Sequence, residues 1–199
     1  MIKIDNLIER SLVLIKPDGV QRGLTGEIIS RFEKTGLKLI AIKLTFPSKE
    51  LAEKHYPKWR EEFLIGIGQK TLENYQELGI DVKENMGTED PKKIGLIVRE
   101  WLIEYLTSGP VVAMIWQGPS AISLIRKLSG HTLPLKAQPG TVRGDFAFDS
   151  SALANLQKRA IKNLLHASGS KEEAEYEIPL WFTPEEIVTY QKVEEKVIF

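Results

Sequence analysis

The chain has 199 residues, of which 42% are hydrophobic and 27% are charged, a composition typical of a globular protein with a real core. Its 27 basic and 27 acidic residues cancel, which argues against a protein that holds nucleic acid mainly through the phosphates. It has no cysteine, so disulfides, thiolate nucleophiles and cysteine-based zinc sites are excluded.

No stretch of the chain predicts a membrane segment. Residues 1–10 have no long apolar run, so we expect no signal peptide. The most apolar stretch, residues 111–116, is too short to span a bilayer. We therefore expect a cytoplasmic protein with no membrane partner.

In the first half of the chain, apolar runs alternate with turn signals. Residues 11–15 (SLVLI) predict a buried strand, which ends at the turn Lys16-Pro17-Asp18-Gly19. A helix from Thr25 to about Gly36 and a strand over 37–46 follow. Further helices are expected over 49–56, 71–78 and 91–106.

The second half contains shorter elements. A strand buried on both faces is expected over 111–116, and a helix over 120–128. Short strands are expected over 145–148 and 164–166, and helices over 171–178 and 184–190, with a loop over 134–140. The order of strands and helices predicts a ferredoxin-like α+β sandwich, an antiparallel sheet with helices on one face.

Two segments place a cation beside a turn. Lys16 directly follows a buried strand and would lie at the mouth of the sheet; the alternative is an exposed lysine of a turn. Arg143 lies in Gly140-Thr141-Val142-Arg143-Gly144-Asp145-Phe146. Its planar guanidinium can donate two parallel hydrogen bonds, a geometry that suits phosphate. A surface arginine is the alternative here. The embedded Arg-Gly-Asp also allows a cell-adhesion reading, against which the following apolar Phe146 and the absence of a secretion signal argue.

A third segment centres on His166. This histidine follows two leucines and precedes a Ser/Gly-rich turn, after which a helix starts with Glu172, Glu173 and Glu177. Imidazole is a good nucleophile near neutral pH when a neighbour fixes its tautomer, and a glutamate of the helix is the candidate neighbour. The alternative is a histidine satisfied within the core.

These segments, with IKPDGVQRGLTGEII, YLTSGPVVAMIW, PGTVRGDF, NLLHAS and EIPLWFTPEEI in this order, resemble the nucleoside diphosphate kinase family. The matching blocks are residues 9–56, 105–146 and 163–190. The resemblance implies that residues 1–199 form a single domain of this kind. It also implies two helical insertions, near 65–98 and near 151–160.

The resemblance further implies an activity. The family transfers the terminal phosphate of a nucleoside triphosphate to a nucleoside diphosphate by a ping-pong mechanism, through a phosphohistidine that aligns with His166. Glu177 would orient the imidazole with the help of Ser168, and Tyr56 would lie near the transferring group. Mg²⁺ would arrive on the nucleotide phosphates, so no metal site of the protein's own is expected.

The nucleotide contacts are also implied by the resemblance. Lys16 would meet the sugar hydroxyl and the transferring phosphate, and Asn163 would bind the sugar. The diphosphate would be held by Arg126, Thr132 and Arg143. Phe63, or alternatively Trp59, would stack on the base, for which loose specificity is expected. The partners expected are nucleoside di- and triphosphates and further copies of the chain, in a tetramer or hexamer, and no nucleic acid.

The chain departs from the family pattern at several positions. Gly169 stands where the family usually has an aspartate, and Leu133 stands in place of an asparagine, with His131 two residues ahead in place of an acid. The larger insertion falls where the family has its nucleotide lid. These departures leave open a catalytically weak family member that binds nucleotides or a partner. A ferredoxin-like RNA-binding module is the remaining alternative, which the neutral charge disfavours.

Overall fold

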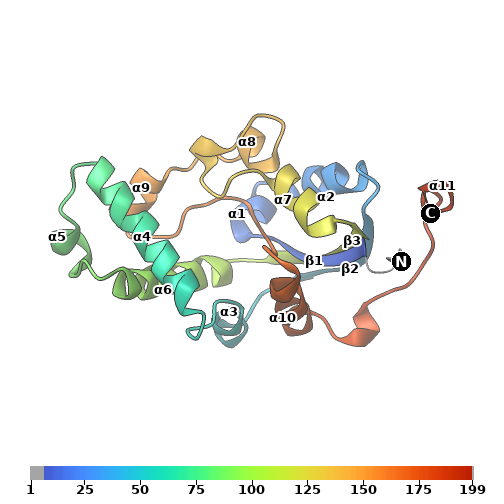
Figure 1. The fold of residues 1–199 in the computed structure, drawn as a ribbon, viewed down its shortest axis with the longest axis horizontal. Coiled ribbons are helices and arrows are strands. Elements are labelled where there is room, and N and C mark those ends of the chain that lie inside the picture. The colour runs from blue at the N-terminus through green and yellow to red at the C-terminus, as the bar shows by residue number, and fades with distance from the viewer. Residues whose placement is uncertain (1–6, 199) are drawn as a thin grey trace.

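The computed structural model describes residues 7–198, and a four-stranded antiparallel sheet lies at their centre (Figure 1). The strands are β1 (Ile8–Ile15), β2 (Lys38–Thr45), β3 (Val111–Pro119) and β4 (Leu165–Ala167), in the spatial order β2-β3-β1-β4. This arrangement confirms the predicted ferredoxin-like α+β fold. Most of the segment in which no signal peptide was expected, residues 1–6, lies outside the described residues.

Helices account for most of the remaining described chain. They are α1 (Pro17–Gln21), α2 (Thr25–Glu33), α3 (Lys49–His55), α4 (Glu61–Glu77), α5 (Val82–Met86), α6 (Pro91–Thr107), α7 (Ala121–Ser129), α8 (Val142–Phe146), α9 (Ser151–Leu156), α10 (Lys171–Trp181) and α11 (Glu195–Ile198), with 3₁₀ turns η2 (Pro134–Lys136) and η3 (Pro184–Glu186).

Helices cover both faces of the sheet, so the expectation of helices on one face was wrong. Phe32 of α2 and Ile125 of α7 pack on one face, whereas Ala52 of α3, Leu106 of α6 and Trp181 of α10 pack on the other. The physical reason lies in the two central strands, β1 and β3, which are apolar at successive positions. Such strands bury both of their faces.

Two local predictions fail for identifiable reasons. The expected turn after the first strand is helix α1, because Pro17 occupies the first helical position, where its missing N–H costs nothing. The strand expected over 145–148 is wrong: residues 145 and 146 end helix α8, and residues 147 and 148 follow it. The side chain of Thr141 caps α8 by accepting the Gly144 N–H at 3.1 Å, and a cap of this kind outweighs a short alternation of apolar residues.

The C-terminal helix prediction also fails in part. Only the turn η3 forms within 184–190, because the backbone N–H of Val188 donates to the carbonyl of Ile40 on β2 at 2.9 Å and holds the chain extended along the sheet. The helix expected over 71–78 is the second half of the longer α4, and α11 was not predicted.

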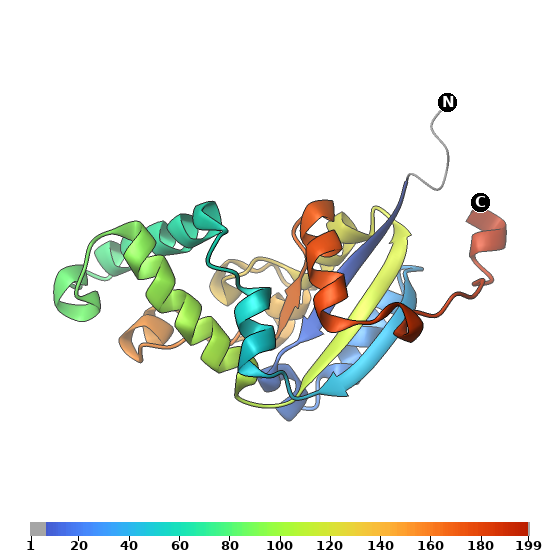
Figure 2. The same ribbon diagram turned by 90° about the horizontal axis from the view of Figure 1, so that it is seen from below.

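Helices α4 and α6 form an arm that projects from the sheet, with α5 at its tip and α9 against its side (Figures 1 and 2). The two long helices contact each other through main-chain atoms at two glycines. A Cβ added to Gly68 would lie 1.8 Å from the carbonyl oxygen of Pro91, and one added to Gly95 would lie 2.0 Å from that of Leu64. Close approach of the backbones therefore requires glycine at both positions.

The arm is tied to the second predicted insertion. The Tyr75 hydroxyl on α4 donates to the backbone carbonyl of Asn155 on α9 at 3.1 Å, and the Asn155 amide donates to the side chain of Asn74 at 2.8 Å. Tyr75 also belongs to a separate small core with Ile94 and Trp101. Residues from the two predicted insertions thus stabilise each other.

We predict that Gly68→Ala destabilises the protein by about 1–3 kcal/mol, because the added methyl group forces the two helix backbones apart. Gly66→Ala is the matched control: it lies on the same helix, a Cβ there meets nothing within 4 Å, and helix propensity favours alanine by about 1 kcal/mol. Thermal unfolding of the wild type, Gly68→Ala and Gly66→Ala measures the change in stability that each substitution causes. Equal melting temperatures for the two variants would contradict the close backbone contact.

Candidate active site

The pairing of β1 with β4 brings distant residues together. Ile15 at the end of β1 lies opposite Leu165, and the backbone N–H of Lys16 extends the ladder by donating to the Leu164 carbonyl at 2.8 Å. The Lys16 ammonium then donates to the side-chain oxygen of Asn163 at 2.8 Å, across 147 positions of sequence. His166 follows three residues after Asn163, on β4 itself.

The connection into β4 is a strained turn. Leu164 has a φ of 72°, and the N–H of Leu165 donates to the carbonyl of Asn163 at 2.8 Å, which makes a γ-turn. A leucine in this conformation costs on the order of 1–3 kcal/mol, so neighbouring contacts must stabilise it. The Asp18 carboxylate accepts the Leu164 N–H at 3.2 Å. Gly19 leaves room for the turn, since a Cβ there would lie 3.0 Å from the Leu164 oxygen.

Asp18 and Tyr105 belong to the site but were not predicted to. The Tyr105 hydroxyl donates to Asp18, and its ring lies 5.0 Å from the Lys16 ammonium. The sequence pattern places Asp18 only in a turn. The available signal was a carboxylate three residues after the end of a buried strand, close to a lysine that itself needs a counter-charge.

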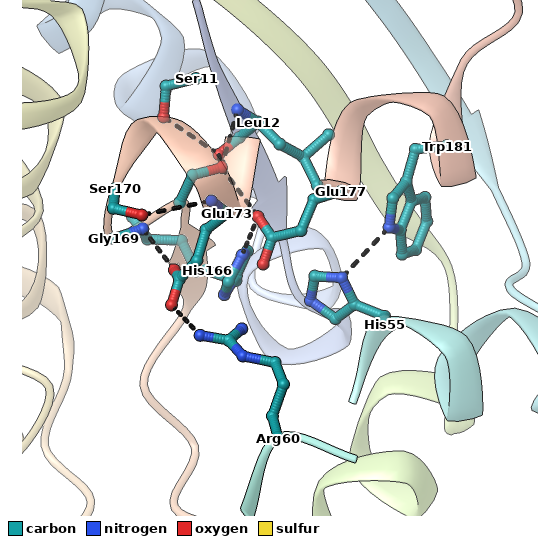
Figure 3. Close-up of polar contacts among 12 residues, drawn as sticks. Ser11, Leu12, His55, Arg60, His166, Gly169, Ser170, Glu173, Glu177 and Trp181 are labelled. Carbon is teal, nitrogen blue, oxygen red and sulfur yellow. Dashed lines mark hydrogen bonds and ion pairs between the residues drawn. The ribbon is translucent and has the colours of Figure 1, made fainter. Parts of the chain in front are cut away.

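His166 is held through one of its two ring nitrogens (Figure 3). Its Nε2 lies 3.0 Å from the Glu177 carboxylate, and the Ser168 hydroxyl donates to the same carboxylate oxygen at 2.7 Å. Ser168 in turn accepts the backbone N–H of Leu12 at 3.1 Å. Because the carboxylate faces Nε2, that nitrogen carries the proton and Nδ1 keeps a free lone pair.

Glu177 stays ionised in this position. It is only 2% exposed, and burial by itself would raise its pKa. The charge of His166 and the hydrogen bonds from His166 and Ser168 outweigh burial and lower the pKa to about 2. The carboxylate is therefore available to stabilise positive charge on the imidazole.

A second histidine, His55, lies against the first and was not predicted. The ring centroids of His55 and His166 are 4.5 Å apart, and the Trp181 indole N–H donates to Nδ1 of His55 at 3.4 Å. Burial, and then the charge of His166, lower the pKa of His55 to about 3, so its ring is neutral. Its position directly before Tyr56 was the only signal in the sequence.

His55, His166 and Glu177 offer ligand atoms within 4.8 Å of one another. Two imidazoles and one carboxylate suit zinc rather than Mg²⁺, which prefers oxygen ligands. In this structure the Glu177 carboxylate is already hydrogen-bonded to Nε2 of His166.

Two buried cations line the site. Burial, reinforced by the charge of Arg143, lowers the pKa of Lys16 to about 7, and Asp18 only partly opposes this. Arg143 donates to the backbone carbonyls of Gly130, Asn163 and Leu165 at 2.7, 3.1 and 2.7 Å. Burial, and then the charge of Arg126, lower the pKa of Arg143 to about 10. Arg143 thus joins the turn before β4 to the loop after α7.

The remaining residues of the predicted site surround this group. Arg126 is exposed on α7, and the Thr132 carbonyl accepts the side-chain amide of Asn163 at 2.9 Å. The Tyr56 ring is buried beside His55 and stacks on Phe63, with ring centroids 6.4 Å apart. Burial, followed by the charge of Glu177, raises the pKa of Tyr56.

Trp59, the alternative to Phe63 for base stacking, lies apart from the group, exposed and edge-on to Tyr176 of α10. Both aromatic residues precede or begin α4, so the structure places them at the base of the arm.

A profile of the nucleoside diphosphate kinase family matches residues 9–65 and 98–187, which include every residue of the predicted site. The chain belongs to the nucleoside diphosphate kinase family. It is accordingly an enzyme of nucleotide phosphotransfer, and the prediction of a kinase is confirmed.

Relatives and solved structures agree with this family. A nucleoside diphosphate kinase of Pyrobaculum aerophilum is 50% identical over 91% of the chain and 98% of its own length, and one of Pyrococcus abyssi is 43% identical over 96% and 94%. The crystal structure of an NDP kinase from Pyrobaculum aerophilum superposes with a TM-score of 0.89 at 49% identity, over 92% of this chain and all of that one.

A more distant structure carries ligands. The nucleoside-diphosphate kinase of Borrelia burgdorferi, solved as a transition-state mimic with bound vanadate and ADP, superposes with a TM-score of 0.75 at 34% identity, over 96% of both chains. No helix in the described part of this chain is long and apolar enough to cross a membrane.

Proposed function

We propose that the chain transfers the terminal phosphate of a nucleoside triphosphate to a nucleoside diphosphate by a ping-pong mechanism through His166. The observation that carries this proposal is the bond from Nε2 of His166 to Glu177, which leaves Nδ1 free on a side chain that is 18% exposed. A nucleophile must combine a free lone pair with access to substrate, and this nitrogen combines both.

The two half-reactions balance as follows. Nδ1 attacks the terminal phosphorus, the bond from phosphorus to the bridging oxygen breaks, and the diphosphate leaves with the electron pair. A terminal oxygen of the second diphosphate then attacks the phosphohistidine, and the bond from nitrogen to phosphorus breaks. Positive charge develops on the imidazole as the first bond forms, and the Glu177 carboxylate, steadied by Ser168, stabilises it.

The nucleotide contacts are those that the family resemblance implies. Lys16 and Asn163 bind the sugar and the transferring phosphate, and Arg126, Thr132 and Arg143 bind the diphosphate, with Tyr56 beside the transferring group. The mutual contacts of Lys16, Asn163 and Arg143 support this grouping. Phe63 at the base of the arm stacks on the base, and because the recognised parts are sugar and phosphate, base preference is loose.

Mg²⁺ enters with the nucleotide in this proposal. The two buried carboxylates of the site are already engaged: Asp18 accepts from Tyr105 and from the Leu164 N–H, and Glu177 accepts from His166 and Ser168. Mg²⁺ commonly binds through substrate phosphates and water, and so neutralises charge on the phosphates that react.

The first prediction concerns transfer itself. With γ-labelled ATP and Mg²⁺, the protein takes up an acid-labile label and passes it to unlabelled GDP, whereas His166→Ala does neither. Autoradiography of the protein and chromatography of the nucleotides measure the two steps. Nucleotide binding without any label on the wild-type protein would instead support the catalytically weak alternative.

The second prediction follows from Lys16. With a pKa of about 7, Lys16 is largely neutral near pH 8, and bound phosphates stabilise its charged form and raise that pKa. Binding of a nucleoside diphosphate near pH 8 therefore takes up close to one proton through Lys16, and much less near pH 6. Calorimetry in buffers of different ionisation enthalpy measures the proton count. An unchanged uptake in Lys16→Met would assign the proton to another group.

We also propose that the chain forms a homo-oligomer, a tetramer or hexamer, in which β2 is covered. This edge strand and the residue after it expose Ile42 (50%), Leu44 (66%) and Phe46 (74%), an apolar row that a soluble protein normally covers. Leu44→Glu should reduce the assembly size measured by light scattering, and exposed Lys34→Glu on the connection after α2 should not. A monomeric wild type, or an unchanged size of Leu44→Glu, would contradict the proposal.

A further inference from the structure

The turn after β4 carries a carboxylate that comes from an unexpected position. Gly169 begins this turn, where the family usually has an aspartate. The Glu173 carboxylate reaches back from the first turn of α10 and accepts the backbone N–H of Gly169 at 2.6 Å. A negative group therefore caps this turn although residue 169 has no side chain.

Glycine at 169 is needed for space and not for backbone conformation, since only glycines with a left-handed φ are restricted and Gly169 is not among them. A Cβ at this position would lie 2.7 Å from the carboxylate oxygen of Glu173. Any side chain at 169 therefore requires the Glu173 carboxylate to shift from its present position. A carboxylate from 169 and the present contact of Glu173 with the turn thus compete for the same space.

The Glu173 carboxylate also binds the base of the arm. Its second oxygen forms an ion pair with Arg60, the residue that precedes helix α4, and both side chains are about three-quarters buried (Figure 3). Two further contacts join the same elements: the Tyr176 hydroxyl on α10 donates to the carbonyl of Lys54 at 2.7 Å, and the rings of Trp59 and Tyr176 meet edge-on at 5.4 Å.

Helix α10 therefore contacts both the segment that carries His166 and the base of the arm. Glu177 on this helix holds the ring of His166, and Glu173, one turn earlier, holds the turn that follows His166 together with the entrance to the arm. A carboxylate in the first helical turn is also favoured by the helix dipole.

We propose that Glu173 is a positioning residue for His166, which supplies from α10 the carboxylate that the family places at position 169. Gly169 is its necessary partner. The proposal rests on the proposed function, since its kinetic consequence is phosphorylation of His166.

The test is a swap of the carboxylate between the two positions. Glu173→Ala lowers the rate of His166 phosphorylation about tenfold, because a loosened turn misplaces the nucleophile, with a smaller change in KM. Gly169→Asp alone also lowers the rate, because it forces two carboxylates together. The double variant Gly169→Asp/Glu173→Ala regains most of the rate. Glu175→Ala, an exposed glutamate of the same helix, is the matched control and leaves the rate unchanged.

A second readout does not depend on catalysis. Each single variant lowers the melting temperature by roughly 2–6 °C, and the double variant regains most of that loss, so the two positions show strong coupling. Should the wild type take up no label, the proposed function fails, and this thermal cycle alone decides whether the carboxylates substitute for each other. Additive losses in the double variant, or a Glu173→Ala protein with wild-type rate and melting temperature, would overturn the proposal.

Discussion

The short pairing of β1 with β4 is the constraint on which the site depends. Only three residues of β4 pair with β1, yet they set the position of His166 and bring Lys16 beside Asn163. The pairing requires the left-handed turn at Leu164, which a leucine adopts only at an energetic cost. The Asp18 carboxylate accepts the Leu164 N–H, and the backbone N–H of Lys16 donates to the Leu164 carbonyl, so both backbone polar groups of Leu164 are hydrogen-bonded. The strain is thus balanced by the same residues that surround the chemistry.

Two basic side chains, Lys16 and Arg143, are held close together in the site. Lys16 and Arg143 are both buried, which lowers the pKa of each; the charge of Arg143 lowers the pKa of Lys16 further, and the charge of Arg126 lowers that of Arg143. Such crowding is unfavourable in the protein alone and becomes favourable when an anion with several charges lies between the cations. The carboxylate of Asp18 accepts from Tyr105 and that of Glu177 pairs with His166, and Asp18 only partly offsets the charge of the two cations. Under the proposed function, this local cost in stability is offset when phosphate binds.

The sequence predicts the sheet, the larger helices and the group around His166, because buried strands and capped helices leave strong local patterns. It does not predict α8, whose start depends on one side-chain cap at Thr141, or the extended chain after η3, which a contact with distant β2 decides. It also misses His55, Asp18 and Tyr105, and it does not reveal that Glu173 contacts Gly169 and Arg60. Each of these acts through a partner that is remote in the chain or on another element, and a single sequence shows no such pairing.

The arm formed by α4 and α6 has a consequence for divergence within the family. Its two helices meet through main-chain atoms at Gly68 and Gly95, so at these two points the contact requires the absence of a side chain. Substitutions elsewhere on the outer surface of the arm leave this joint intact. The arm is therefore a region where new surface chemistry can evolve, while the catalytic end of the molecule is unchanged.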